Sequence, residues 1–181
     1  MKLRDWVQRA ERADLALYAA VARSDTPALD RAMRRLSHAA NYSRIWICAA
    51  GLLAVAGGAN GRRAAFDGVA SIAFTSVVVN AALKPLGRRR RPERGPLLAR
   101  HVRMPKSRSF PSGHAASAFA FATGVAATQP ALGLPLRGLA AVVAYSRVHT
   151  GVHFPGDVVI GSLLGVSLAQ VTIRAGERRR A

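Results

Sequence analysis

Long blocks of apolar residues alternate with short arginine-rich stretches along this chain of 181 residues. Apolar blocks of about 15 to 20 residues have the length of membrane-spanning helices, whereas arginines are costly inside the hydrocarbon layer. We therefore predict an all-α fold, a polytopic membrane helical bundle with about five transmembrane helices. The predicted spans are 45–59 (beginning near Asn41), 64–83, 112–129, 136–148 and 158–173.

The first 40 residues follow an amphipathic pattern instead. Apolar residues recur there at helical spacing with charged residues between them, although Asp14 interrupts the apolar stripe. Thr26 and Pro27 predict the start of a second short helix, with a capping hydroxyl and then proline in the first turn. We predict N-terminal amphipathic surface helices over 1–40, a membrane-embedded domain over 41–175, and a basic tail over 176–181.

The segment 84–110 contains ten lysines and arginines and four prolines, so we predict a polar loop. With five spans, this loop and the segment 146–157 emerge on the same side of the membrane. The formal net charge of +18 indicates nucleic acid, anionic lipid or a phosphorylated substrate as the partner. Aromatic residues make up only 6% of the chain and do not interleave with the arginines, so nucleic acid is not expected.

Residues suited to phosphate chemistry adjoin the apolar blocks at three places. Cationic side chains bind phosphate oxygens, and a serine and glycine at a helix start add N–H donors. Two histidines allow a two-step transfer, in which one attacks phosphorus and the other protonates the leaving oxygen. The spacing of four also lets an aspartate orient one imidazole. The candidates are Lys84, Arg91, Ser112, Gly113, His114, Arg147, His153 and Asp157.

No acidic cluster of the kind that hard metal ions require occurs in these loops, so we predict a reaction that needs no metal and no other cofactor. Cys48 lies alone in an apolar block and predicts nothing about function. Gly161 and Gly165 share one face of the last predicted span, where they would permit close helix packing or self-association into a homo-oligomer.

The three segments together resemble the type 2 phosphatidic acid phosphatase family, which shares its site with vanadium-dependent haloperoxidases. The family's motifs are Lys, six residues, Arg-Pro; then Pro-Ser-Gly-His; then Ser-Arg, five residues, His, three residues, Asp. They match 84–92, 111–114 and 146–157 in this order, and the resemblance covers about 45–173. Many members have six spans, one more than predicted here.

The resemblance implies a role for each matching residue. His153 would be the nucleophile, His114 the general acid, and Asp157 the group that orients His153. The phosphate-binding residues would be Lys84, Arg91, Ser112, Gly113 and Arg147. His149 lies close by, but the motif spacing selects His153, and we interpret Arg88, Arg89 and Arg90 mainly as headgroup anchors.

The resemblance implies a lipid phosphatase, and a polyprenyl-linked substrate is our leading hypothesis, either decaprenylphosphoryl-phosphoribose phosphate or a polyprenyl pyrophosphate. Phosphatidic acid and phosphatidylglycerol phosphate are the alternative substrates. A non-catalytic protein that binds anionic lipid and a haloperoxidase-like enzyme are the alternative functions. The distribution of arginines places the site at the cytoplasmic face of the plasma (inner) membrane. Arg100, Arg103, Lys106 and Arg108 are expected to form a solvated basic loop, with contact to a large anionic headgroup as the alternative.

Overall fold

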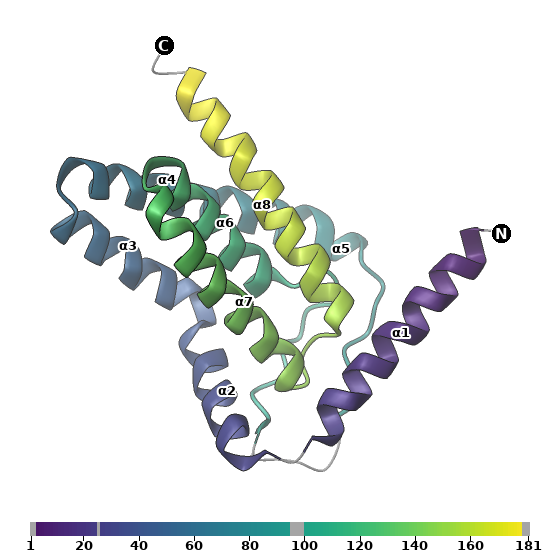
Figure 1. Cartoon of the computed structure of the whole chain (residues 1–181). Helices are drawn as coiled ribbons and strands as arrows, with labels where there is room; N and C mark the ends of the chain where they lie inside the picture. The colour runs from purple at the N-terminus through teal and green to yellow at the C-terminus, as the bar shows by residue number, and fades with distance from the viewer. Residues whose placement is uncertain (1–2, 25, 95–99, 179–181) are drawn as a thin grey trace.

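The computed structural model describes residues 3–24, 26–94 and 100–178, and every regular element in them is helical (Figure 1). This confirms the predicted all-α class. In chain order the longer helices are α1 (Leu3–Arg23), α2 (Pro27–Ala39), α3 (Arg44–Ala56), α4 (Gly58–Val77), α6 (Gly113–Thr128), α7 (Gly133–His149) and α8 (Pro155–Arg178). Short segments connect them: η1 (Asn41–Ser43), the π-helical η2 (Val78–Leu83), α5 (Lys84–Leu86) and η4 (Pro130–Leu132).

Helix α6 is the centre of the bundle and contacts α4, α7 and α8. Its small residues are almost all buried, and Phe121 packs against Trp46 of α3 with a centroid separation of 5.5 Å. A Cβ at Gly161 would lie 2.5 Å from the carbonyl oxygen of Ser112, and one at Gly165 only 2.2 Å from that of Ala116. The glycine face of α8 therefore packs against α6 of the same chain, and self-association does not use it.

Two helices are long and apolar enough to cross a membrane, namely Gly58–Leu86 and Pro155–Arg178. The pair Pro27–Ala39 and Asn41–Ala56, bent by 63°, would form a third span, so α2 is half of a candidate broken span rather than only a surface helix. Helices α6 and α7 occupy the other predicted spans but have only 16 and 17 residues. The count of five is thus approximate, because a helix needs about 20 residues to cross the hydrocarbon core and these two are shorter.

One predicted boundary was wrong. The gap predicted between the first two spans, 60–63, lies inside α4, and the chain instead reverses at Gly57 and Gly58, the latter with φ +59°. Gly61 is needed for close packing, because a Cβ there would lie 2.2 Å from the carbonyl oxygen of Leu53. Helix α2 does begin at Pro27, but the side chain of Thr26 does not cap it.

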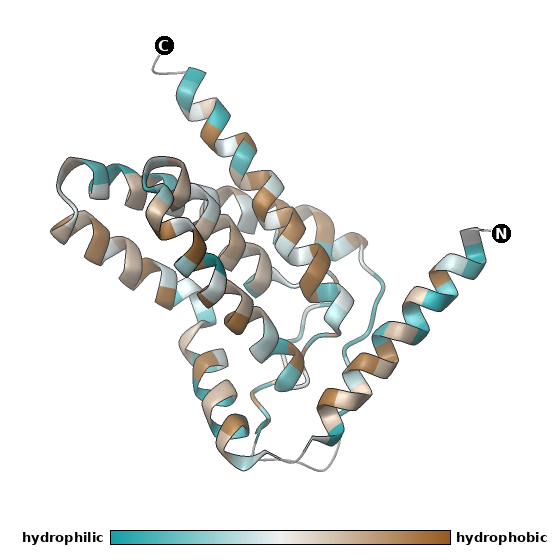
Figure 2. Ribbon diagram, in the orientation of Figure 1, coloured by the Kyte–Doolittle hydropathy of each residue, from teal (hydrophilic) through white to brown (hydrophobic). Residues whose placement is uncertain are grey.

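The N-terminal helices differ in how they join the bundle. Helix α2 packs against α7 through a buried polar face that includes Asp30 and Ser37. Helix α1 extends away from the bundle and approaches it near the start of α8 (Figure 1). Figure 2 shows the apolar residues concentrated in the bundle and the hydrophilic ones in the loop that follows α5. That α1 lies on a membrane surface remains a prediction.

Candidate active site

The predicted site residues come from four helix ends that lie at the same end of the bundle. Lys84 begins α5, Ser112 and Gly113 start α6, Arg147 belongs to the last turn of α7, and Asp157 to the first turn of α8. His114 lies close enough to Lys84, Arg91, Arg147 and His153 for their charges to act on it. The structure therefore gathers in one place the residues that the sequence separates by up to 73 positions.

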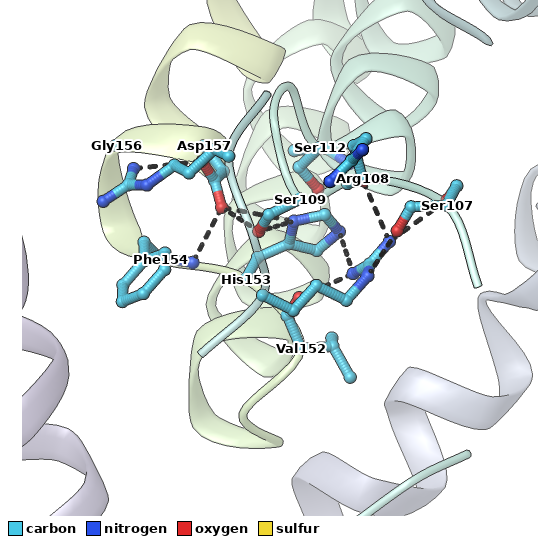
Figure 3. Close-up of polar contacts among 12 residues, drawn as sticks. Ser107, Arg108, Ser109, Ser112, Val152, His153, Phe154, Gly156 and Asp157 are labelled. Atoms are coloured by element: carbon cyan, nitrogen blue, oxygen red, sulfur yellow. Dashed lines mark hydrogen bonds and ion pairs between the residues drawn. The ribbon is translucent and has the colours of Figure 1, made fainter. Parts of the chain in front are cut away.

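His153 and Asp157 form a buried pair in the turn between α7 and α8 (Figure 3). One carboxylate oxygen of Asp157 lies 3.5 Å from Nδ1 of His153. The same oxygen accepts a 2.5 Å hydrogen bond from the Ser109 hydroxyl and a 3.0 Å bond from the backbone N–H of Phe154. These donors fix the carboxylate, which in turn favours a proton on Nδ1 and leaves Nε2 with its lone pair.

Arg91 faces the other nitrogen of the ring. Its Nη1 lies 3.3 Å from His153 Nε2 and donates a 2.6 Å hydrogen bond to the carbonyl of Val152. Further bonds to the carbonyls of Ser107 and Arg108 hold the guanidinium in place. Burial, together with the charges of Arg91 and Arg147, lowers the pKa of His153 to about 4, so its imidazole is neutral at physiological pH.

The start of α6 lies beside Lys84. A Cβ on Gly113 would be 3.5 Å from Lys84 Nζ and 3.2 Å from Asn80 Oδ1, so the glycine keeps the backbone close to this ammonium group. Ser112 is the N-cap of α6, and its hydroxyl accepts from the N–H of Ala115. A helix N-terminus beside a lysine combines N–H donors with positive charge, which suits a phosphate group.

His114 borders two adjoining cavities of about 430 and 200 Å³. Arg147 lines the larger cavity, and Lys84 and Gly113 line the smaller one. His114 Nε2 lies 3.1 Å from Asn41 Oδ1, which orients the ring. Arg147 is only 2% exposed and donates 2.5 Å and 3.3 Å bonds to Ser37, while its Nε has no protein partner among the described residues.

The sequence analysis missed several residues that support these side chains. Ser109 and Arg89 contact Asp157, Asn41 contacts His114, and Ser37 contacts Arg147. Ser109 lies just two residues before the Pro-Ser-Gly-His motif, a signal that could have been used. Arg89, which we interpreted as a headgroup anchor, forms a 3.1 Å ion pair with Asp157, because the loop folds back over the start of α8.

Two other candidates belong to a separate buried network. His149 Nε2 lies 2.7 Å from Asp30 Oδ1, and its Nδ1 lies 3.2 Å from the hydroxyl of Tyr145. Arg100 pairs with Asp30 at 3.2 Å and is 3% exposed. Arg100 therefore fastens α2 to the bundle, so the expectation of a solvated loop residue was wrong for Arg100, and so was the alternative of a headgroup contact. Arg103 and Lys106 do line the larger cavity.

The arrangement as a whole is a cluster of cationic and imidazole groups with the chemistry to bind an oxyanion. His114 and Arg147 line the larger cavity, and His114, Lys84 and the start of α6 line the smaller one. His153 and Arg91 do not line either cavity but lie close enough to His114 to interact with it electrostatically. Arginine and lysine can bind the oxygens of a phosphoryl group, and the imidazole can attack its phosphorus. In the described part of the chain, no group of three or more acidic, histidine or cysteine residues could hold a metal ion.

Residues 65–181 match the family described as the PAP2 superfamily. The chain belongs to this superfamily. A decaprenylphosphoryl-5-phosphoribose phosphatase of Mycobacterium tuberculosis is 35% identical over 176 residues, which cover 96% of each protein. These findings confirm the resemblance predicted from the sequence and the expectation of a phosphatase.

Solved PAP2 structures share the fold. The phosphatidylglycerolphosphate phosphatase of Bacillus subtilis superimposes with a TM-score of 0.69 and 25% identity, covering 94% of this chain and 87% of that one. LpxE of Aquifex aeolicus gives a TM-score of 0.69 and 25% identity, over 88% of this chain and 94% of that one. The Bacillus protein is a transmembrane phosphatase, so the comparison supports the prediction of a multi-pass membrane protein.

Proposed function

We propose that this PAP2 protein is a lipid phosphatase that removes phosphate from a polyprenyl-linked lipid through a phosphohistidine intermediate. The observation that carries the mechanism is the placement of His153 between Asp157 at Nδ1 and Arg91 at Nε2. A phosphoryl group bound by Arg91 would have its phosphorus next to the lone pair of Nε2. Asp157 would stabilise the positive charge that the ring gains when it attacks.

In the first step, Nε2 of His153 forms a bond to phosphorus, and the bond between phosphorus and the ester oxygen breaks. His114 gives a proton to the departing oxygen, which leaves as the lipid alcohol. Lys84, Arg91, Arg147 and the backbone N–H of Gly113 hold the equatorial oxygens during this transfer, whereas the N–H of Ser112 donates to the carbonyl of Asp157. The negative charge of the bound phosphate favours the protonated form of His114.

In the second step, water enters on the side where the alcohol left. His114 accepts a proton from this water, the oxygen attacks phosphorus, and the bond between phosphorus and Nε2 breaks. The products are inorganic phosphate and the free enzyme, with His114 protonated again. Each residue named here acts without a metal ion, so activity in the presence of a chelator is expected.

The substrate proposal is supported by the relative from Mycobacterium tuberculosis, whose name states a lipid with a phosphoryl linkage and a phosphorylated ribose. Such a headgroup carries two phosphates. Beyond Arg147, the larger cavity is lined by Arg103, Lys106 and His38, which would surround the linkage phosphate while the terminal phosphate reaches His153.

Helix α2 extends this basic surface. Arg31, Arg34, Arg35 and His38 line an adjoining hollow of about 430 Å³, which shares His38 with the larger cavity. The spacing of three and four residues puts all four side chains on one helix face. Among the described residues, none of these three arginines forms an ion pair. They would therefore be free to attract a headgroup with a second negative charge.

Phosphate release from a panel of lipids tests both reaction and substrate. The panel contains decaprenylphosphoryl-5-phosphoribose phosphate, undecaprenyl diphosphate, phosphatidylglycerol phosphate and phosphatidic acid, each with excess EDTA. We expect the highest kcat/KM for the first lipid and no loss with EDTA. A strong preference for phosphatidic acid would contradict the substrate proposal, and inactivation by EDTA would contradict the mechanism.

The double variant Arg34→Gln/Arg35→Gln tests the second phosphate contact. We expect KM for the phosphoribose lipid to rise about three- to tenfold, with little change for phosphatidic acid. The matched control is Arg62→Gln/Arg137→Gln, which removes two exposed charges at the starts of α4 and α7, away from the site. An equal rise of KM for both lipids, or in the control, would argue for a general attraction to the membrane.

For the location, we propose the cytoplasmic face of the inner membrane, on the basis of the arginine distribution. We further propose that residues 41–175 carry the phosphatase core and that 1–40 complete the site, since Ser37 and His38 reach it.

Cys48 is the one cysteine in the sequence, so Cys48→Ala with Arg90→Cys gives a single reporter in the loop. A membrane-impermeant maleimide should label it in inverted vesicles and not in intact spheroplasts, and the reverse result would place the site outside.

A further inference from the structure

Helix α1 reaches the catalytic pair through one aspartate. Asp14 Oδ2 forms a 2.6 Å ion pair with Nη2 of Arg89, and Nη1 of the same guanidinium forms the 3.1 Å pair with Asp157 Oδ1. Arg89 thus bridges two carboxylates, one from α1 and one from the candidate active site. The two carboxylates are 143 positions apart in the sequence.

The contact of Asp14 extends to the start of α8. Its Oδ1 accepts a 2.6 Å hydrogen bond from the backbone N–H of Gly156, which lies in the first turn of the helix that carries Asp157. The first N–H groups of a helix have no partner inside that helix, so Asp14 supplies a cap from another element. One carboxylate therefore fixes both the guanidinium beside Asp157 and the backbone next to it.

Arg89 is held tightly for a loop arginine. Its guanidinium carbon lies 4.0 Å from the centroid of the Phe154 ring, and Tyr18 packs edge-on against the same ring at 5.4 Å. Tyr18 also donates a 3.1 Å hydrogen bond to the carbonyl of Glu93. Asp14 and Tyr18 are four residues apart and so lie on one face of α1, which explains why an aspartate interrupts the apolar stripe of this helix.

The net charge of Asp14, Arg89 and Asp157 together determines how they act on His153. A guanidinium paired with Asp157 alone would neutralise the carboxylate charge that stabilises the positive ring of phosphorylated His153. Asp14 shares the guanidinium, so the triad of two carboxylates and one arginine keeps a net negative charge beside the imidazole. Because Asp157 is fully buried, this charge is weakly screened and acts strongly on the ring.

We infer that Asp14, on the N-terminal helix, is a positioning residue for the catalytic pair, and acts through Arg89 on Asp157 and His153. This inference rests on the proposed function of His153. The PAP2 match begins at residue 65, so the contribution comes from a part of the chain outside the region that the family match covers. It assigns α1 a role in turnover, whereas the sequence predicted only a surface helix.

The variant Asp14→Asn tests this inference, because asparagine can still accept from Gly156 but has no charge. In the full-length protein we expect kcat to fall about five- to tenfold with KM nearly unchanged. The matched control is Glu11→Gln, which removes a negative charge one turn earlier on α1, from a residue in the same groove that contacts neither Arg89 nor Asp157. Equal losses in both variants would overturn the inference.

A double-mutant cycle tests the route through Arg89. If Asp14 acts through Arg89, the loss in Asp14→Asn should be much smaller in an Arg89→Gln background than in the wild type. If Asp14→Asn lowers kcat by the same factor in the Arg89→Gln background as in the wild type, this route is contradicted.

A spectroscopic measurement separates this inference from the proposed function. In protein with isotope-labelled histidine and no substrate, Asp14→Asn should shift the ring nitrogen resonances of His153 and leave those of His149 unchanged. An unchanged His153 spectrum would overturn the inference whether or not the protein is a phosphatase. Absence of phosphatase activity in the wild type would instead defeat the proposed function.

Discussion

His149 and His153 lie four residues apart, both are buried, and both face an aspartate, yet the structure uses them differently. Both ring nitrogens of His149 are taken by protein groups, Asp30 and the hydroxyl of Tyr145. In His153 only Nδ1 faces acceptors, and Nε2 faces Arg91 at the site. Burial and a nearby carboxylate therefore do not identify a catalytic histidine. In the proposed mechanism, the distinguishing feature is a ring nitrogen directed at a cluster of cations.

The largest effect should follow from removal of the nucleophile. His153→Ala should lower kcat by at least about 10³-fold, because no other group can form the covalent intermediate. With ³²P-labelled substrate, quenched wild-type enzyme should carry an acid-labile, alkali-stable phosphoryl group that the variant lacks. Turnover within about tenfold of wild type in His153→Ala would remove the distinction between the two histidines.

Arg91→Ala should have the next largest effect, a loss of about 10²-fold in kcat/KM. This guanidinium contacts Nε2 of His153 and would bind the transferring phosphoryl group, so both binding and chemistry suffer. Arg91→Lys should recover only part of the loss, since an ammonium group cannot replace the several bonds that the planar guanidinium makes. Arg90→Ala is the matched control, and an equal loss there would indicate a general effect of loop charge.

His149→Gln should affect stability more than turnover. The substitution breaks the contact with Asp30 in a buried network, which typically costs about 1–3 kcal/mol. We expect the midpoint of thermal inactivation in detergent to fall by several degrees and kcat at low temperature to stay within about threefold of wild type. A loss of kcat comparable to that of His153→Ala, in protein that remains folded, would give His149 a direct part in the reaction.

The smallest expected effect concerns the protonation state of the His153 ring at mildly acidic pH. Burial lowers the pKa of His153 to about 4, so its ring should stay neutral as pH falls from 7 to 5. NMR titration of isotope-labelled histidines, assigned with His153→Gln, should show no protonation of His153 in this range. A midpoint near the ordinary value of about 6.5 would contradict the arrangement described here.

The same depressed pKa has a consequence for stability. Between about pH 6.5 and 4 the unfolded chain binds a proton at this histidine and the folded chain does not. The contribution of His153 to the free energy of unfolding is therefore fully present above about pH 6.5 and is lost as pH falls toward 4. Comparing the pH dependence of unfolding in the wild type and in His153→Gln isolates this contribution.

Much of the site followed from the sequence because its residues sit in short motifs at helix ends. Lys84, His114 and Asp157 adjoin apolar blocks, and alternate blocks return the chain to the same side of a bilayer. Counting the apolar blocks was therefore enough to predict that these residues lie at the same end of the bundle. The supporting contacts escaped because they join distant segments: Asn41 with His114, Ser37 with Arg147, and Asp14 with Arg89.

Hydrophobic block length and local residue spacing are properties of the chain alone, and they were sufficient to predict the helical class, the membrane character and the order of the proposed phosphate-binding groups. The folded arrangement was needed to show that Nε2 of His153 faces Arg91 while both ring nitrogens of His149 contact Asp30 and Tyr145, and that Arg89 reaches Asp157. It also showed that the glycines of α8 pack against α6. Such outcomes depend on which helices touch and at what angle, and pairwise packing of side chains is not encoded in the periodicity of any one segment.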